Sequence, residues 1–497
     1  MTAPAQSAAP DDTVAVAAAH MNRDVVSSLV VVSKGRPVGI LTERDVLHAA
    51  GSGVDLATET VASWMTADPD CLDPDVDVDA AWKQFAERHY RHLPVVVDGE
   101  LLGVVSLRDL TSMAHLHPAD EAHVAPAGLK GLVVAETALG DVRGEEGFYH
   151  YRQYSAPELA RSRSFEDVWH LLIDGSLPHI DERSRFADEV APFRALPASV
   201  LEVLPAVSRN AGSVSSALRT ALSHHASVLA LPNSMDVDHA ARRTQALQLS
   251  AVVPALIAAI HRLRAGLDPV PSRPDLGYAA DYLHMLLGEE ASAERVRAIE
   301  QYLILGIDHG FNASTFTTRV VTSTGSDLGS AIVAGVGALL GPLHGGAPSR
   351  ALDTLDEIGS PDRAAAWVRN KVAAGERIMG FGHPVYRTAD PRSVMLRSIA
   401  QGLGGELVEF AVQVEAEVER TLAELKPDRP LHTNVEWYAA VVMDRCGLDR
   451  DLFTPTFTAS RVVGWCAQAL EQAADNRIIR PSSRYVGPPP PQPVPSV

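Results

Sequence analysis

The chain has 497 residues, of which 46% are hydrophobic and 21% charged, and its 62 acidic and 43 basic side chains give a formal net charge of −19. This composition is typical of a globular protein that is too long for one ordinary domain. The acidic excess excludes a general nucleic-acid binder, which needs Lys and Arg to neutralise phosphates.

The N-terminus and the cysteines indicate where the protein resides. The first residues, MTAPAQSAAPDD, have neither the basic nor the apolar region of a secretory signal. The longest apolar stretches, 251–260 and 331–340, are shorter than the roughly 20 residues that span a bilayer. Three widely spaced cysteines form no CxxC pair and no metal-ligand group with histidine. We therefore expect a cytoplasmic protein with no membrane span, disulfide framework or metal site.

One unit of sequence occurs twice before about residue 115. Gly39 recurs as Gly103, and the same offset of 64 residues relates Asp45 to Asp109 without a gap. Each copy has the pattern of an amphipathic helix, an apolar β-branched strand, a glycine turn, a second strand and a further helix. The first copy begins at the chain start, so we expect it to lack an opening strand. An α/β pair is predicted over residues 1–115.

This pair resembles tandem CBS domains, the Bateman module, in its PD starts, its HLPVVVDGELLGVVSLRDL run and its duplication. The resemblance implies regulation by AMP, ADP or ATP, bound near the residues that follow the second strand of each copy: Thr42, Arg44, Asp45, Ser106, Arg108 and Asp109. A carboxylate can accept from both ribose hydroxyls, while hydroxyl and guanidinium groups can donate to phosphate. The alternative is that the two aspartates only cap the helices that follow them.

Downstream, the pattern changes. Periodicity stops in AHLHPADEAHVAP, which predicts a linker over residues 116–127. Long Ala-, Leu-, Arg- and Glu-rich segments then predict a mostly α-helical unit over residues 128–487, with almost no strands. The predicted helices are 217–230, 239–266, 293–305, 326–340, 364–374, 406–425, 437–446 and 458–473. The Pro-rich residues 488–497 predict an extended tail.

Three histidines lie at breaks between these helical segments. They are His309 in DHGFNASTF, His344 in GPLHGGAPS and His383 in GFGHPVYRTADPR, each flanked by Gly, Asn, Ser or Pro. Loops on a rigid scaffold are where reactive groups concentrate. Glu436 and several arginines lie at similar breaks. Histidines with one carboxylate and several guanidinium groups suit a reaction in which an anionic substrate is held while a proton is moved at carbon.

Residues 128–487 are similar to the citrate synthase family over essentially their whole length. The motifs that carry the resemblance, in family order and spacing, include SFEDVWHLLIDGSLP, DHGFNASTF, GPLHGGAP, GFGHPVYRTADPR, NVEWY and LFTPTFTASRVVGW. The resemblance implies a helical homodimer or higher homo-oligomer with a small domain, roughly 344–440, that closes over the substrates. It implies an acyltransferase that condenses acetyl-CoA or propionyl-CoA with oxaloacetate, giving citrate or 2-methylcitrate and CoA, without a covalently bound cofactor.

The resemblance also implies roles for single residues. His344 matches the acid that hydrogen-bonds the thioester carbonyl, His383 matches the histidine that polarises the oxaloacetate ketone, and Glu436 takes the place of the aspartate base. Oxaloacetate ligands of the family are matched by His309, Arg392 and Arg461. Arg480 matches an arginine that the partner subunit contributes to the site. The coenzyme A side is matched by Arg387, Gly380, Phe381 and Gly382.

Two positions depart from the family pattern, which usually reads Pro before Asn-Val-Asp. This chain has Thr433 and Glu436 at the first and last of these positions. Thr leaves φ free where Pro would fix it, so we expect Thr433 to let the loop adapt to the longer side chain of Glu436. The departures also motivate an alternative: a catalytically degenerate, citrate-synthase-like regulatory protein that senses adenylates.

Overall fold

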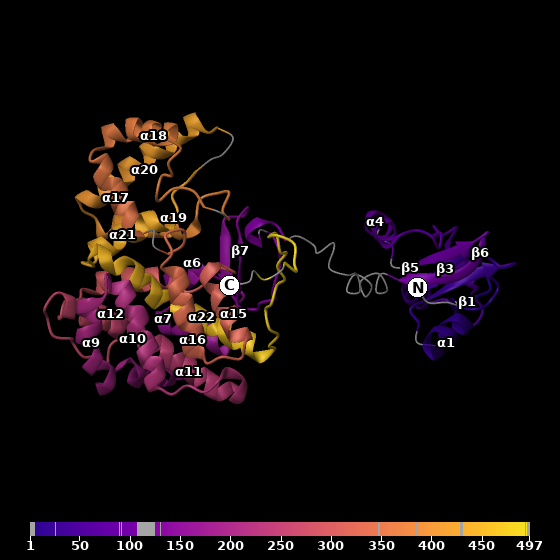
Figure 1. The fold of residues 1–497 in the computed structure, drawn as a ribbon, viewed down its shortest axis with the longest axis horizontal. Coiled ribbons are helices and arrows are strands. Elements are labelled where there is room, and N and C mark those ends of the chain that lie inside the picture. Colours follow the sequence, from indigo (N-terminus) through magenta and orange to yellow (C-terminus); the bar gives the residue numbers. More distant parts are fainter. Residues whose placement is uncertain are drawn as a thin grey trace. The chain divides into compact units, whose positions relative to one another are not determined.

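The structure is a computed structural model of the chain, and it describes residues 5–24, 26–88, 90, 92–106, 125–129, 131–345, 348–383, 385–427, 431–492 and 494. The chain forms two compact units, Met1–Val134 and Ala135–Val497 (Figure 1). The N-terminal unit mixes strands and helices, and the C-terminal unit is mostly helical, so the predicted fold class is confirmed.

The N-terminal unit contains a four-stranded sheet in the order β1-β2-β3-β4 and a separate hairpin, β5-β6. Apolar side chains of each sheet pack against neighbouring helices and form two small cores, one around Leu29 and Val31 and the other around Leu93 and Val95. The elements are β1 (Ser7–Ala8), α1 (Val14–Asp24), β2 (Ser28–Ser33), β3 (Arg36–Thr42), α2 (Glu43–Gly51), α3 (Val61–Trp64), β4 (Thr66–Ala67), α4 (Val78–Arg88), β5 (His92–Val97) and β6 (Glu100–Ser106).

The sequence repeat is also a repeat of backbone geometry. The β2–β3 and β5–β6 hairpins have the same bounds at an offset of 64 residues, and each pairing shifts at a bulge, after Val31 in one and after Val95 in the other. Each hairpin turns through two residues with positive φ, 52° and 80° at 34–35 and 51° and 81° at 98–99. Such turns match the right-handed twist of the flanking strands, and the second position favours glycine.

The expectation that the first copy lacks an opening strand is wrong. β1 is short, but Ala8 pairs in parallel with Val31 of β2. The equivalent parallel bridge in the second copy joins Leu72 to Val95, again 64 residues later. Two paired residues are too few to give an alternating pattern that the sequence would reveal.

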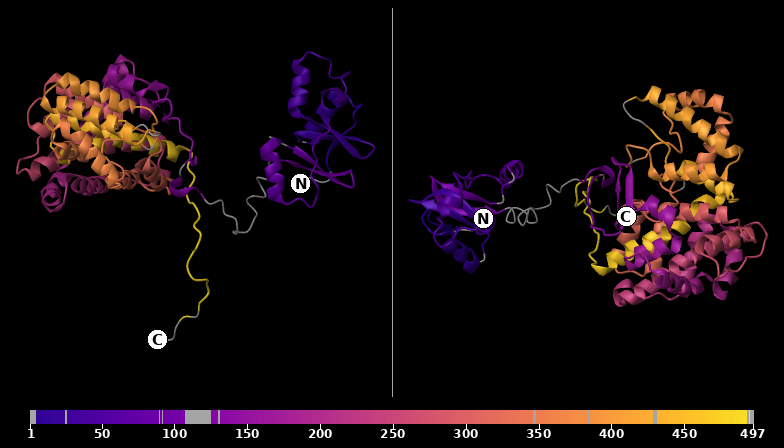
Figure 2. Two further views of the ribbon diagram at one scale, coloured as in Figure 1. Left: turned by 90° about the horizontal axis from the view of Figure 1, so that it is seen from above. Right: turned by 180° about the vertical axis from the view of Figure 1, so that it is seen from behind.

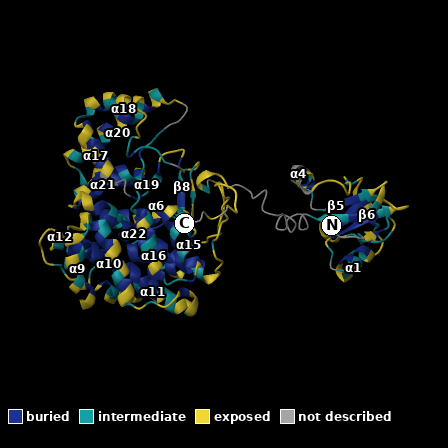
Figure 3. Ribbon diagram, in the orientation of Figure 1, coloured by how far each residue is buried: buried dark blue, intermediate teal, exposed yellow. Residues whose placement is uncertain are grey.

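The C-terminal unit has a central helix, α22 (Phe453–Ala474), against which several others pack. Its residues from Thr458 to Leu470 are buried, and it contacts α11, α14, α15 and α16 (Figure 3). The other helices are α6 (Ala156–Ser162), α7 (Phe165–Asp174), α8 (Ile180–Val190), α9 (Ala198–Asn210), α10 (Val214–Val228), α11 (His239–Ala251), α12 (Val253–Arg264), α13 (Tyr278–Leu287), α14 (Ala293–Gly306), α15 (Ala313–Ser323), α16 (Leu328–Leu339), α17 (Pro348–Ile358), α18 (Ala364–Ala373), α19 (Pro391–Leu403), α20 (Glu406–Leu425) and α21 (Val435–Arg445).

Within this unit, α17 to α21 lie together on one side, away from α9 to α12 (Figures 1 and 2). The segment predicted as one helix over 239–266 is two helices that meet at Val252. Pro254 at the start of α12 has no N–H for the carbonyl of Ser250, which instead accepts the Tyr278 hydroxyl at 3.3 Å. The stretch His239–Arg264 is long and apolar enough to cross a membrane, but 78% of its most apolar part is buried inside the unit, as in a core helix.

A small sheet precedes α6 and was not predicted. It consists of β7 (Gly140–Arg143), β8 (Phe148–Tyr151) and β9 (Tyr154–Ser155) in that order. The buried hydroxyls of Tyr149 and Tyr151 donate to the carbonyls of Leu305 and Ile304 at 3.2 and 2.8 Å, so the sheet is attached to the end of α14.

Candidate active site

Histidines from two loops meet near the end of α14. His309 follows α14, and His383 lies in the loop before α19; their ring centroids are 5.6 Å apart. Tyr386 joins them, with its hydroxyl 2.8 Å from His309 Nε2 and its ring 4.8 Å from that of His383. Burial lowers the pKa of His383 to about 4 and that of His309 well below its usual value, and Arg392 adds to both effects. Both rings are therefore neutral at pH 7.

The tautomer of His383 follows from its hydrogen bonds. Its Nδ1 accepts the backbone N–H groups of Val385 and Tyr386 at 3.1 and 3.2 Å. The proton of the neutral ring is thus on Nε2, which lies 3.2 Å from Nη2 of Arg392. Two donor atoms therefore lie side by side, and an acceptor oxygen next to them would satisfy both.

His344 lies in the loop after α16 and contacts the start of α15. Its Nε2 is 2.8 Å from the hydroxyl of Ser314, which also accepts the indole N–H of Trp465 at 3.2 Å. Asn312, the N-cap of α15, holds Ser314 by accepting its backbone N–H at 3.1 Å. Burial, assisted by Arg461, lowers the pKa of His344 to about 4, so this ring is also neutral at pH 7.

Two buried arginines lie close enough to buried aspartates to interact with them electrostatically, and one of the two forms an ion pair. Arg392 donates from Nε and Nη2 to Asp390 at 3.0 and 2.7 Å, and Asp390 also caps α19. Arg461 donates from Nε to the carbonyl of Gly306 at 2.7 Å. Burial raises the pKa of Asp308 to about 6, although the positive charge of Arg461 opposes this shift. Each guanidinium keeps further N–H groups that can bind an anion.

Glu436 lies in the first turn of α21. Asn434 caps this helix, and its Oδ1 accepts the Glu436 N–H at 3.1 Å. Burial raises the pKa of the Glu436 carboxyl to about 7, while Arg392 opposes the shift. A carboxyl with this pKa can accept and release a proton near neutral pH.

Backbone pairing joins the loop of His383 to the loop before Glu436. Phe381 forms a β-bridge with Thr433, Gly382 N–H donates to the His432 carbonyl at 2.8 Å, and Asn434 N–H donates to the Gly380 carbonyl at 2.9 Å. Gly380 has φ of 88°, and a Cβ there would lie 2.6 Å from the Trp437 ring, so only glycine fits.

The remaining predicted residues are less involved in this cluster. Arg387 is half-exposed, and its N–H bonds to the Gly144 carbonyl at 3.1 Å. Arg480 is exposed and forms no hydrogen bond or ion pair with the part of the chain that the structure describes. In the N-terminal unit, Arg44 is exposed, Ser106 ends β6, and Arg108 and Asp109 lie outside the described residues.

Asp45 caps α2, as the alternative interpretation predicted. Its Oδ2 accepts the N–H and the hydroxyl of Thr42 at 2.8 and 2.7 Å. Its Oδ1 accepts no hydrogen bond from the described residues, so capping leaves one carboxylate oxygen open to a ligand.

The sequence did not identify four residues that contact or adjoin the predicted ones: Ser314, Tyr386, Asp390 and Asp308. Two of them carry a signal that could have been used. Asp390 precedes Pro-Arg at the start of α19, a pattern typical of a helix N-cap, and Asp308 adjoins His309. Ser314 and Tyr386 contact histidines 30 and 77 residues away, and no local pattern predicts such pairs.

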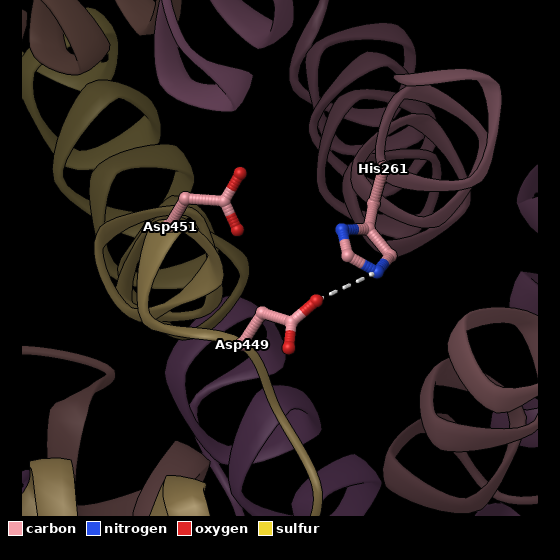
Figure 4. Close-up of side chains that lie close together, drawn as sticks. All are labelled: His261, Asp449 and Asp451. Atoms are coloured by element: carbon pink, nitrogen blue, oxygen red, sulfur yellow. Dashed lines mark ion pairs between the residues drawn. The ribbon is translucent and has the colours of Figure 1, made fainter. Parts of the chain in front are cut away.

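One group among the described residues could hold a metal ion: His261, Asp449 and Asp451 (Figure 4). His261 Nε2 lies 3.5 Å from a carboxylate oxygen of Asp449, whose side chain is 73% exposed. A surface ion pair accounts for this arrangement, and it lies outside the loops that carry the three histidines above.

Comparisons with known proteins identify the families that the chain resembles. Residues 128–482 match the model of the citrate synthase C-terminal domain, and residues 1–52 and 61–115 match that of the CBS domain. The citrate synthase of Deinococcus radiodurans is 36% identical over 361 residues, which are 72% of this chain and 95% of that protein. The 2-methylcitrate synthase of Mycobacterium tuberculosis is 38% identical over 372 residues, 74% of this chain and 92% of that protein.

A solved structure is also similar. Citrate synthase from Thermoplasma acidophilum, in a ternary complex with carboxymethyl coenzyme A and oxaloacetate, aligns with a TM-score of 0.70 at 28% identity and covers 74% of this chain and 98% of that chain. The chain belongs to the citrate synthase family. It is an enzyme of that family with a pair of CBS domains in its N-terminal unit.

Proposed function

We propose that the enzyme condenses acetyl-CoA or propionyl-CoA with oxaloacetate and releases CoA, and that its own side chains perform each step. The relatives support both products, since proteins named citrate synthase and 2-methylcitrate synthase are 36% and 38% identical to it. Enzymes of this family use no prosthetic group, so the histidines, Glu436 and the arginines must supply the chemistry.

In the first step, Glu436 removes a proton from the α-carbon of the acyl-CoA. The thioester oxygen then gains negative charge and needs a donor. The Ser314 hydroxyl lies 2.8 Å from both Asn312 Oδ1 and His344 Nε2, and in the reacting complex it would turn to donate to His344 Nε2. His344 then carries its proton on Nδ1, from which it donates to the thioester oxygen.

In the second step, the enolised carbon attacks the ketone of oxaloacetate. The observation that carries the proposal is the pair of donors, His383 Nε2 and Arg392 Nη2, which lie 3.2 Å apart. The ketone oxygen would accept from both, its developing charge would be stabilised where it forms, and the resulting alkoxide would take the Nε2 proton of His383. Arg392, Arg461 and His309 would hold the carboxylates. Water then hydrolyses the thioester product and releases CoA.

Release of free thiol tests this proposal directly. The full-length protein is incubated with oxaloacetate and either acetyl-CoA or propionyl-CoA, and the thiol is measured. We expect release with at least one donor. The ratio of the two kcat/KM values then identifies the acyl group, since one methylene is worth about 1–3 kcal/mol. Absence of thiol release with both donors would contradict the proposal and restore the regulatory-protein alternative, which the relatives do not favour.

We further propose that the smaller group of helices, roughly 344–440, closes over the bound substrates. It carries His344, His383 and Glu436, whereas His309 and Arg461 belong to the remainder of the helical unit. Closure would bring the two sets together and exclude water while the enolised intermediate exists. Phe381, Gly382 and Arg387 would contact coenzyme A on the same side.

The CBS pair is proposed to bind an adenine nucleotide and to change the rate of the synthase. Its support is the exposed guanidinium of Arg44 and the open Oδ1 of Asp45 at the start of α2. A nucleotide can act only if it binds the more and less active states with different affinities.

Calorimetry on the full-length protein tests the nucleotide site. Heat is expected with AMP, ADP or ATP, and Arg44→Ala should weaken it, which distinguishes the CBS site from nucleotide binding at the coenzyme A site. If no nucleotide gives heat at millimolar concentration, the CBS pair serves only to associate subunits.

A further inference from the structure

A chain of buried polar groups joins α19, α20 and α21 behind Glu436. The Ser393 hydroxyl donates to Thr433 Oγ1 at 2.9 Å, and the Thr433 hydroxyl donates to Glu415 Oε1 at 2.9 Å. All three residues are at least 94% buried, as their exposed fractions are 2%, 6% and 6%. A buried polar group without a hydrogen bond destabilises the fold, so these hydrogen bonds favour one arrangement of the three elements.

The other oxygen of Glu415 completes the connection. Its Oε2 accepts the hydroxyl of Tyr438 from α21 and lies 3.3 Å from Nε of Arg397 in α19. The carboxylate of Glu415 in α20 is therefore held by side chains of both neighbouring helices. A single carboxylate thus connects α20 to both α19 and α21.

Two members of this series of hydrogen bonds, Ser393 and Thr433, adjoin residues of the active site. Ser393 adjoins Arg392, whose guanidinium lies beside His383. Thr433 pairs with Phe381 on one side and adjoins Asn434, the cap of the helix that begins with Val435 and Glu436. A shift of Thr433 would therefore move Glu436 relative to His383 and Arg392.

We propose that Thr433 and Glu415 are positioning residues that place the carboxyl group of Glu436 at the reacting carbon. A proline at position 433 would have neither hydroxyl nor N–H, whereas Thr433 donates its hydroxyl to Glu415 and its N–H to Glu419 at 3.3 Å. The hydrogen bonds of Thr433 thus hold the loop where a proline ring would otherwise stiffen it, and the loop can accommodate the longer side chain of Glu436. This inference rests on the proposed role of Glu436 as the base.

Thr433→Val tests the inference, because Val keeps the β-branched shape and removes the hydroxyl. We expect exchange of the acyl-CoA α-protons with solvent, and kcat, to fall about 10- to 100-fold, with little change in the KM for oxaloacetate, since a misplacement of ~1 Å can cost on the order of 10²-fold. Thr433→Ser, which keeps the hydroxyl, should restore most of the rate. Glu415→Gln should reproduce the loss if the Val variant does not fold.

Thr421→Val is the matched control. Thr421 lies in α20, as Glu415 does, and its buried hydroxyl has no hydrogen-bond partner among the described residues. This variant should exchange α-protons at the wild-type rate. If Thr433→Val also exchanges at that rate and only its melting temperature falls, the positioning role is wrong. If Glu436→Gln still exchanges the protons, the assignment of the base fails instead, whatever Thr433→Val does.

Discussion

Replacing Glu436 by Gln should abolish exchange of the acyl-CoA α-protons with solvent while oxaloacetate still binds. Gln has nearly the same shape as Glu but cannot take up a proton. Glu436 is the acidic residue in the first turn of α21, so this change removes the carboxylate there. A loss of 10²-fold or more is expected, the size of a general-base contribution, which is about 10²- to 10⁴-fold. Proton exchange is followed by NMR, and oxaloacetate binding by calorimetry.

The pH dependence of the wild-type exchange reports on the same group. Burial raises the pKa of Glu436 to about 7, and a base must be ionised to act. The exchange rate should therefore be low below pH 6, rise through neutral pH and level off above it. A profile that is already flat at pH 5 would assign the proton transfer to another group.

Glu436→Asp is the second half of this test. The reference pKa values of Asp and Glu, about 3.9 and 4.3, are nearly equal, so this change tests reach and not basicity. We expect no gain in rate, since the loop around Thr433 is held in place for the longer side chain. A much faster Asp variant would show that the site still suits aspartate. It would support the alternative of a catalytically degenerate regulatory protein.

Replacing Arg480 by Ala should raise the apparent KM for oxaloacetate strongly while the fold is retained. The family resemblance implies that this arginine enters the active site of the partner subunit, and in the single chain it is exposed and unpaired within the described residues. Truncation of one partner of a buried charge pair costs about 2–5 kcal/mol. Arg484→Ala, another exposed arginine four residues further on, is the control and should leave KM unchanged.

Mixed oligomers show which subunit provides Arg480. Suppose that Arg480 acts in the active site of the partner subunit. An Arg480→Ala subunit paired with a Glu436→Gln subunit then has one intact site, because the Glu436 of the first subunit meets the Arg480 of the second. Mixing two nearly inactive variants should then restore part of the activity. If Arg480 acts within its own chain, every site in the mixture has a defect, and activity stays low. An unchanged KM in the Arg480→Ala variant would show that this arginine is only a surface residue with no role in binding oxaloacetate.

Elements with a long, regular pattern were predictable from the sequence. The predicted helix over 406–425 agrees with α20 at both ends, and the repeat located both hairpins. Hydrophobic periodicity is a local property, so it reveals such elements. The sheet of β7 to β9 was missed because its strands have only two to four residues.

The site was only partly predictable. Motif order predicted a site of three histidines and Glu436, and the structure brings two of these residues, His309 and His383, together. Thr433 shows where sequence alone is insufficient: we expected a residue with free φ, but its hydroxyl and N–H are both bonded to glutamates of α20. The partners are 14 and 18 residues away, on a different helix, and only the packing of the helices brings them together.

The equal geometry of the two N-terminal hairpins has a consequence for how this unit evolves. Their bulges and turns are the same, although Lys34 in one turn corresponds to Asp98 in the other. The same backbone thus accepts a different side chain at this position of the turn. Because each copy provides its own frame, one can lose its ligand contacts by mutation while the other retains them, and the two halves are free to specialise.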